Sequence, residues 1–258
     1  MAFPACSDGP GIEKSSRFRG RADSLSSMST RSILAVLAAL PLFWATAHAQ
    51  TQLAGQVDLL EMHVGRGDDH FLFDSTFTLS GDRQGAAFKL EGGSDVGAHI
   101  DEVTAQALYT FAPNSGTNIL LGVRNDFRGG RDLGHAALGV ELQITPAIAG
   151  EHYLWLSQDG DVTGAAMIVG TLALGEALRL EPRVAVGWSA QSIPAEEVGA
   201  GIGELELSAR LRHQIGPVLN VYGGIIDERL VGQTRRIARA QGDDGHVTRA
   251  VIGLGLNF

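Results

Sequence analysis

The sequence of 258 residues has one cysteine, Cys6, and contains no run of 18 consecutive apolar residues. A membrane-spanning helix needs about 20 such residues, so helical spans are not expected. With a single cysteine, neither an intrachain disulfide nor a thiolate metal site is expected. The patterns GxSxG, Walker A, HExxH and the EF-hand loop are also absent. These absences remove several common signatures of hydrolases, nucleotide-binding proteins and calcium-binding proteins.

The first 49 residues are predicted to be an N-terminal extension and a cleaved signal peptide. A basic segment ends at Arg31, an apolar run extends from Ile33 to Thr46, and the small-x-small motif AHA at 47–49 precedes Gln50. This order matches an export signal with cleavage after position 49. Residues 1–27 are long and of mixed charge for such a signal, which favours Met28 over position 1 as the true start.

Removal of this segment leaves an acidic chain without a thiol. The whole sequence carries a formal net charge of −9, and residues 1–49 hold five basic and three acidic side chains, so the remainder carries −11. A negative field of this size disfavours nucleic acid as a partner and suits cations.

From Gln50 onward the sequence alternates with a period of two, and no helical periodicity of useful length is found. The last stretch, HVTRAVIGLGLNF at 246–258, places apolar side chains at even positions and small or polar ones at most odd positions. Twelve stretches of this kind predict strands at 53–65, 69–80, 84–92, 98–111, 117–127, 134–144, 150–158, 163–174, 177–190, 200–215, 217–230 and 246–258.

The connections between these strands alternate in length. Tight turns such as SGDR at 80 and PNSG at 113 follow even-numbered strands, whereas longer loops such as QSIPAEEVGAG at 191 and GQTRRIARAQGDDG at 232 follow odd-numbered strands. An up-and-down barrel with both termini in the periplasm has this rhythm, and bacterial barrels have an even number of strands. We therefore predict an all-β fold for residues 50–258, a twelve-stranded antiparallel up-and-down transmembrane β-barrel in the cell outer membrane.

Strand parity also predicts the two faces of the barrel wall. The lipid face is expected to include Phe71, Phe73, Phe77, Leu79, Ile119, Leu121, Val123, Phe127, Leu205, Leu207 and Leu211. The lumen face is expected to carry Glu61, His63, Asp74, Lys89, Glu91, Glu102, Gln106, Arg124, Asp126, His135, Glu141, Gln143, Arg179, Glu181, Arg183, Glu204, Glu206, Arg210, Arg212 and Arg249. A midplane Arg or Lys on the lipid face costs roughly 2 to 4 kcal/mol, so these charges must lie inside. Salt bridges that plug the lumen are the favoured interpretation, and a selective path for cations is the alternative.

Seven short motifs occur in an order that resembles the copper resistance protein B family of outer-membrane proteins. They are EVTAQALY at 102, LLGVRNDF at 120, LEPRVAV at 180, GIGELELSARLRHQI at 201, ERLVGQT at 228, ARAQGDD at 238 and TRAVIGLGLNF at 248, with a weaker match over LLEMHVGRGDD at 59. The resemblance implies an outer-membrane barrel involved in copper binding, homeostasis or resistance. The partners that we expect are outer-membrane lipid, lipopolysaccharide and the barrel-assembly machinery, and a periplasmic multicopper oxidase is a further candidate.

The chain departs from the family in one respect. Many members carry a segment rich in Met and His between the signal peptide and the barrel, and here only TQLAGQVD separates the predicted cleavage site from the charged part of the first strand. Met62 and Met167 are the two methionines of the predicted mature chain. Copper would then have to bind within the barrel, where imidazole and carboxylate ligands suit Cu(II) better than Cu(I).

Two groups of residues are candidate copper ligands. Closure of the barrel by its first and last strands would bring the loops DDH and DDGH together at the outer rim, which supplies Asp68, Asp69, His70, Asp243, Asp244 and His246. The second group, Glu61 and His63, would point into the lumen just below. The alternatives are acidic loops that are solvated or hold calcium or magnesium among lipopolysaccharide phosphates, and a histidine that serves packing only.

Two other functional classes are open at this point. The first is a general outer-membrane pore or structural barrel without metal specificity. The second is an outer-membrane hydrolase, for which the DDH sequence could supply an acid and a histidine that activate water. No motif order supports the hydrolase, so we do not expect an enzyme.

Overall fold

The computed structural model describes residues 52–65, 69–95, 102–128 and 131–258. The predicted N-terminal extension and signal peptide, and the candidate ligand Asp68, lie outside the described residues. The strands are β1 (Gln52–Gly65), β2 (His70–Ser80), β3 (Gln84–Asp95), β4 (Glu102–Asn114), β5 (Thr117–Arg128), β6 (Leu133–Thr145), β7 (Ile148–Ser157), β8 (Val162–Gly170), β9 (Leu172–Ala173), β10 (Leu178–Ser189), β11 (Gly201–Ile215), β12 (Leu219–Leu230) and β13 (His246–Asn257). Two short helices are described as well, η2 (Pro194–Glu196) and α2 (Gly232–Ala240).

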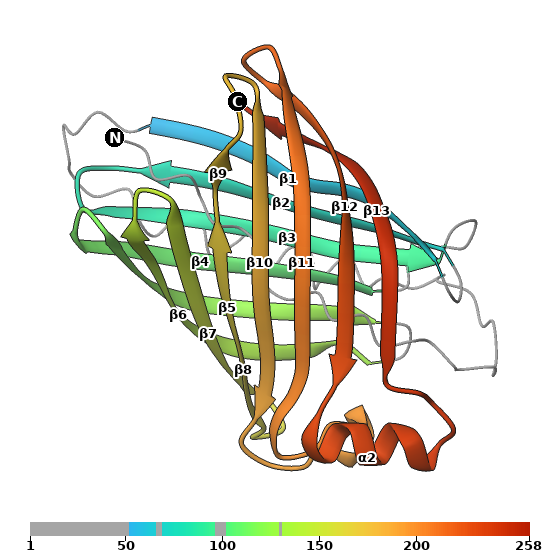
Figure 1. The fold of residues 1–258 in the computed structure, drawn as a ribbon. Helices are drawn as coiled ribbons and strands as arrows, with labels where there is room; N and C mark the ends of the chain where they lie inside the picture. The colour runs from blue at the N-terminus through green and yellow to red at the C-terminus, as the bar shows by residue number, and fades with distance from the viewer. Residues whose placement is uncertain (1–51, 66–68, 96–101, 129–130) are drawn as a thin grey trace, which may run out of the picture.

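All strands belong to one antiparallel sheet that closes on itself (Figure 1). Each long strand pairs with its neighbours in the chain, β10 pairs with both β8 and β11, and β13 pairs with β1. Since β9 has only two residues, the wall consists of twelve long strands, as the sequence predicts. The predicted eighth strand is shorter than expected, because β8 ends at Gly170 and the remainder forms β9 against β10.

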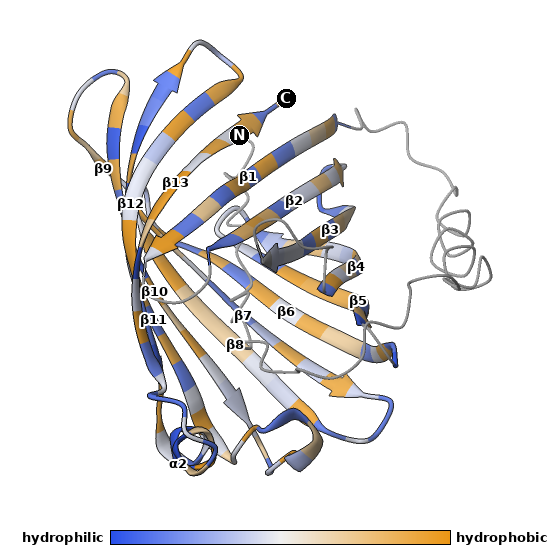
Figure 2. Ribbon diagram, turned by 90° about the vertical axis from the view of Figure 1, so that its right-hand side faces the viewer, coloured by the Kyte–Doolittle hydropathy of each residue, from blue (hydrophilic) through white to orange (hydrophobic). Residues whose placement is uncertain are grey.

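The outer surface of the wall is apolar. Large aliphatic side chains remain exposed on it, including Leu121 at 59 % and Ile252 at 63 % exposure. Figure 2 shows the residue-by-residue alternation between hydrophobic and hydrophilic positions along the strands. The lipid-face prediction agrees with this surface at Phe77, Leu79 and Leu207, which are also exposed. In the described residues, no helix is long and apolar enough to cross a membrane.

The buried side chains of the lumen are of two kinds. An apolar cluster of buried residues lies on the inner face of strands β3 to β8, and it consists of Ala87, Leu108, Leu120, Ala137, Tyr153, Trp155 and Ala165. Buried charged side chains occupy most other inward positions, and they include Glu61, Asp74, Lys89, Asp126, Glu151, Glu181, Arg183, Arg210, Arg212 and Arg249. Most of these charged residues were predicted from parity to face the lumen.

The two ends of the barrel differ in the way that the sequence predicts, with one exception. The start of β1 and the end of β13 lie together, because Gly55 and Phe258 exchange backbone hydrogen bonds of 2.7 and 2.9 Å. The opposite end carries the longer connections (Figure 1). The prediction of a loop at 232–245 was wrong for its first nine residues, which form α2. The helix is fixed by tertiary contacts, since Thr234 is buried and its hydroxyl accepts a hydrogen bond of 3.1 Å from the backbone N–H of Gly199.

Candidate functional site in the barrel lumen

One almost fully buried ion pair of the lumen joins β1 to β11. Arg210 donates two hydrogen bonds to the Glu61 carboxylate, at 2.8 and 2.9 Å, and both side chains are almost fully buried. The imidazole of His63 lies 2.5 Å from the same carboxylate through Nε2. A bidentate arginine is the strongest arrangement available for a carboxylate removed from water. Both oxygens of Glu61 are therefore occupied by other side chains.

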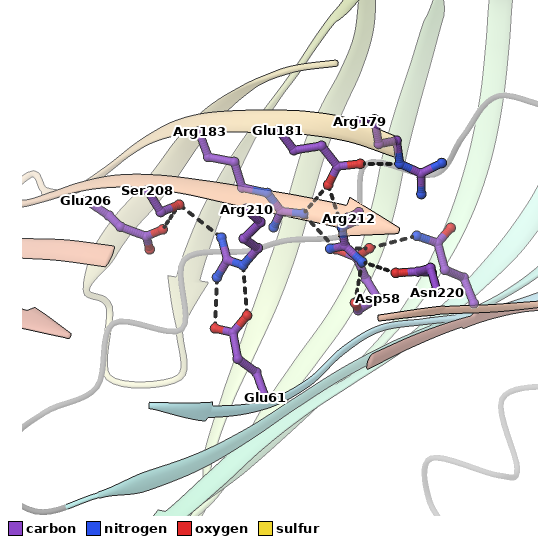
Figure 3. A network of polar contacts seen from close by, with 11 residues as sticks. Asp58, Glu61, Arg179, Glu181, Arg183, Glu206, Ser208, Arg210, Arg212 and Asn220 are labelled. Atoms are coloured by element: carbon purple, nitrogen blue, oxygen red, sulfur yellow. Dashed lines mark hydrogen bonds and ion pairs between the residues drawn. The ribbon is translucent and has the colours of Figure 1, made fainter. Parts of the chain in front are cut away.

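A second group of ion pairs lies beside the first (Figure 3). Arg212 contacts Glu181 at 2.6 Å and Asp58 at 3.2 Å, and Arg183 contacts Asp58 at 3.1 Å. The Arg212 guanidinium also stacks over the ring of Tyr222, 4.3 Å from its centroid. Because Asp58 belongs to β1 and the arginines belong to β10 and β11, these contacts cross the interior. They support the predicted salt-bridge plug.

Strand parity did not predict that Asp58 would face the lumen. Alternation from Glu61 and His63 places positions 57 and 59 inside, not position 58. The structure has an irregularity in β1 at this point, where the register with both neighbouring strands shifts after Val57. Such a β-bulge inserts one extra residue and reverses the facing of the residues that precede it. This local change brings the Asp58 carboxylate to Arg183 and Arg212.

A third group joins β3 to β6 and β7 on the other side of the lumen. Lys89 donates a hydrogen bond of 2.7 Å to the hydroxyl of Tyr153, and its ammonium lies 3.6 Å from both Glu141 and Glu151. Glu141 and Glu151 face each other directly across β6 and β7. Glu151 and Tyr153 were missed from the sequence, because EHYLWLS places large side chains on both faces of β7 and the alternation gives no clear sign of the inner face.

Residues of the predicted rim cluster contact residues outside that cluster. The imidazole of His246 lies 2.8 Å from Asp227 of β12, and Asp243 accepts a hydrogen bond from the N–H of Gly245. Asp69 and Asp244 are exposed. His70 is buried, and its Nε2 lies 3.1 Å from an Arg249 nitrogen.

The structure does bring His70 close to a residue of the second candidate group. His63 and His70 are directly opposite each other in the antiparallel pairing of β1 with β2, and both side chains are buried in the lumen. Directly opposed residues of such a pair have Cβ atoms about 5 Å apart. Among the described residues, no group of three or more His, Cys, Asp or Glu side chains is arranged to hold a metal ion. His63 and His70 are therefore two buried imidazoles that lie side by side across β1 and β2.

Comparison with known protein families gives one match that covers the whole described barrel. The family model described as copper resistance protein B precursor (CopB) matches residues 51–258. A copper resistance protein B homolog of Pseudomonas syringae pv. tomato is 27 % identical over 201 residues, which cover 78 % of this chain and 68 % of that protein. Copper resistance protein B of Escherichia coli is 26 % identical over 205 residues, with the same coverage of both chains.

Comparison with solved structures finds porins. A KdgM porin in complex with disordered oligogalacturonate has a TM-score of 0.49 and 8 % identity, and the match covers 79 % of this chain and 99 % of that chain. A NanC porin has a TM-score of 0.49 and 9 % identity, with 80 % and 99 % coverage.

Proposed function

The chain belongs to the copper resistance protein B family, and on that basis we propose that it is an outer-membrane barrel that binds copper ions and contributes to copper resistance. The observation that carries the proposal is the family match, which extends over residues 51–258 and so includes every described strand. The resemblance of seven short motifs within the same range supports it from the sequence.

The outer surface supports the location in a membrane. A soluble barrel would expose polar side chains on its outer face, whereas this one exposes Leu121, Ile168 and Ile252 at 59, 53 and 63 %. A closed barrel satisfies the backbone hydrogen bonds of its strands internally, which is what a lipid environment requires. Both features fit an outer-membrane barrel with its charged residues in the lumen.

The lumen offers ligands that suit copper. His63 donates from Nε2 to the Glu61 carboxylate, which leaves its buried Nδ1 without a hydrogen-bond partner in the described chain. A carboxylate that orients one imidazole nitrogen and leaves the other for a metal is a common arrangement around ligand histidines. We propose His63, with His70 opposite it, as the residues of the barrel that bind Cu(II), with copper as cargo rather than as a resident cofactor.

Two measurements test the function together. A strain that lacks the protein should grow less well than its parent on copper, and a plasmid-borne copy should restore growth. The purified, refolded barrel should bind Cu(II) or Cu(I) in a calorimetric titration. If copper sensitivity is unchanged in the deletion strain and the barrel gives no binding heat with either ion, the copper proposal is wrong and a general barrel without metal specificity takes its place.

A further inference from the structure

The connection between β10 and β11, residues 190–200, reaches across the end of the barrel that lies away from the chain termini. It carries η2, and it folds back on itself through two backbone hydrogen bonds between Ile193 and Val198, at 2.8 and 3.2 Å. Ile193 is buried, with 8 % exposure. This segment is called the mouth loop below.

One side chain of the mouth loop contacts the far wall. The Glu196 carboxylate accepts a hydrogen bond of 2.5 Å from Arg128, which lies at the end of β5. In the closed ring of twelve long strands, β5 is four strands from β10 and five strands from β11. The ion pair therefore spans the interior at the barrel mouth and does not join neighbouring strands.

Arg128 is held in place without Glu196. Its guanidinium also contacts Glu102 of β4 at 3.0 Å and Asp126 of its own strand at 3.1 Å. Arg128 and Glu196 are about one-quarter exposed, so water reaches the contact that joins the loop to the wall. Loss of the Glu196 carboxylate would remove this contact of the loop with β5 and leave the arginine paired.

Other contacts of the mouth loop lie on its own side of the barrel. Gln191 donates a hydrogen bond of 2.8 Å to Asp161, in the connection between β7 and β8. Gln241, just after α2, donates one of 2.8 Å to Glu197. The loop then returns to β11 through the sequence GAGIG at 199–203, where Gly201 has a φ of +91° that favours glycine. The exit is held to α2 by hydrogen bonds from the N–H of Gly199 to Thr234 and from the N–H of Ala200 to Gln233. A loop that is fixed at one side can move about that side when its far contact opens.

We propose that the mouth loop is a lid over the lumen, and that the Glu196–Arg128 ion pair keeps it closed. Entry of small hydrophilic solutes from the loop-bearing end requires this pair to open. The inference concerns access to the lumen and does not depend on which solute is bound there, so it goes beyond the copper proposal.

A cysteine placed beneath the lid can report its opening. Thr104 is suited to this because its side chain is 6 % exposed and it pairs in register with Asp126, one inward position below Arg128. The Thr104→Cys protein, in a Cys6→Ser background, is reconstituted in vesicles and treated with a neutral methanethiosulfonate. The modification rate is compared between this protein and one that also carries Glu196→Gln. This substitution removes the negative charge of the Glu196–Arg128 ion pair and keeps the size of the side chain.

Ion pairs between partly exposed side chains contribute little free energy. When the lid opens and closes quickly, the modification rate follows the population of the open state. Glu196→Gln should therefore increase the modification rate by about threefold to fivefold. The matched control is Asp159→Asn. Asp159 pairs with Arg131 at 2.8 Å at the same end of the barrel, but both residues belong to connections next to each other and the pair does not cross the mouth. This control should react at the rate of the parent.

Equal rates for Glu196→Gln and the parent would overturn the proposal, and so would a similar increase in Asp159→Asn, since that result would indicate general loosening of the rim. If Glu196→Gln does not fold, the parent alone can be tested at low ionic strength and at about 1 M salt, which screens partly exposed pairs. The modification rate, corrected for the effect of salt on the reaction of a free thiol, should be higher at high salt. An unchanged rate would contradict the lid. Since no copper is present, failure here is distinct from failure of the copper proposal.

Discussion

Glu61 and Arg210 show what a buried charge requires of its partner. Arg210 is 3 % exposed, and the carboxylate of Glu61 receives two of its hydrogen bonds. Glu61→Ala should lower the free energy of unfolding by about 3 to 5 kcal/mol, because it leaves a buried guanidinium without its partner. Unfolding by denaturant in detergent, followed by the gel-mobility difference between folded and unfolded barrels, measures the change.

The matched control for this prediction is the exposed pair of Arg229 and Asp227. Arg229 is 52 % exposed, so Arg229→Ala should change the free energy of unfolding by less than about 1 kcal/mol. The double variant Glu61→Leu, Arg210→Leu should cost less than Glu61→Ala alone, since it removes both charges. A double variant that is as unstable as the single one would contradict the explanation by an unpaired charge.

The histidines give the second prediction at this scale. His63→Ala should weaken Cu(II) binding by about tenfold or more if His63 supplies a ligand, because loss of a ligand or of the group that orients it commonly costs 10- to 100-fold in affinity. His213 is exposed on β11 and serves as the control, so His213→Ala should bind as the parent does. The measurement is a calorimetric titration.

The same titration separates the two predicted arrangements of ligands. Paired substitution His70→Ala, His246→Ala removes the rim pair, and paired substitution His63→Ala, His70→Ala removes the facing pair of β1 and β2. Since His246 lies against Asp227 and His63 faces His70, the second double variant should lose more affinity. An unchanged isotherm in both would remove the barrel histidines from consideration.

At the scale of elements, a buried hydroxyl holds α2 against the connection that precedes β11. Thr234 is 4 % exposed, and it accepts a hydrogen bond from the N–H of Gly199. Thr234→Val keeps the shape but leaves this buried N–H without its acceptor, at a cost of about 1 to 3 kcal/mol. The helix should then open more often, and trypsin should cleave at its arginines about tenfold faster. Thr145→Val, in an exposed turn at the other end, is the control and should not alter cleavage in α2.

The strands were predictable and the helix was not, for a physical reason. A strand that has one face toward lipid and the other toward polar side chains needs apolar and polar residues to alternate along its whole length. This alternation is visible in any stretch of about ten residues. The twelve predicted spans accordingly correspond to the twelve long strands. By contrast, α2 has nine residues, which are too few for a helical period to stand out, and it is positioned by a contact with Gly199, 35 residues away in the sequence.

The site was predictable to the same extent. Parity gave the inward position of Glu61, Arg210 and Arg212, because those strands are regular there. It could not give the partner of each charge, since contacts such as the one between Asp58 and Arg183 depend on which strands meet across the lumen and on a bulge in β1. The pairing of His63 with His70 follows from register, which is fixed by the length of the connection between β1 and β2.

At the scale of the whole molecule, buried side chains of the described strands meet across the lumen, and on that basis we expect a plugged interior rather than an open channel. Ion pairs from β1 to β10 and β11 occupy one side, the Lys89 group occupies the other, and the apolar cluster around Tyr153 lies among them. A general pore would keep a water-filled path of fixed width. The protein in a planar bilayer should therefore show no large, steady conductance, and a large steady current without copper would favour the general pore.

Removal of one neutral ion pair should open a path along β1. Asp58→Ser with Arg212→Ser removes one acidic and one basic side chain, and it leaves Glu181 within reach of Arg179 at 2.8 Å and of Arg183 at 3.7 Å. The measurement is made in a Glu196→Gln background, so that the mouth loop does not limit the current. The conductance should rise about twofold or more, because these charged side chains no longer occupy the constriction.

The control is the double variant Asp227→Ser, Arg229→Ser in the same background. It removes an exposed ion pair and should leave the conductance unchanged. An unchanged conductance in the Asp58→Ser, Arg212→Ser protein would contradict this view of the lumen.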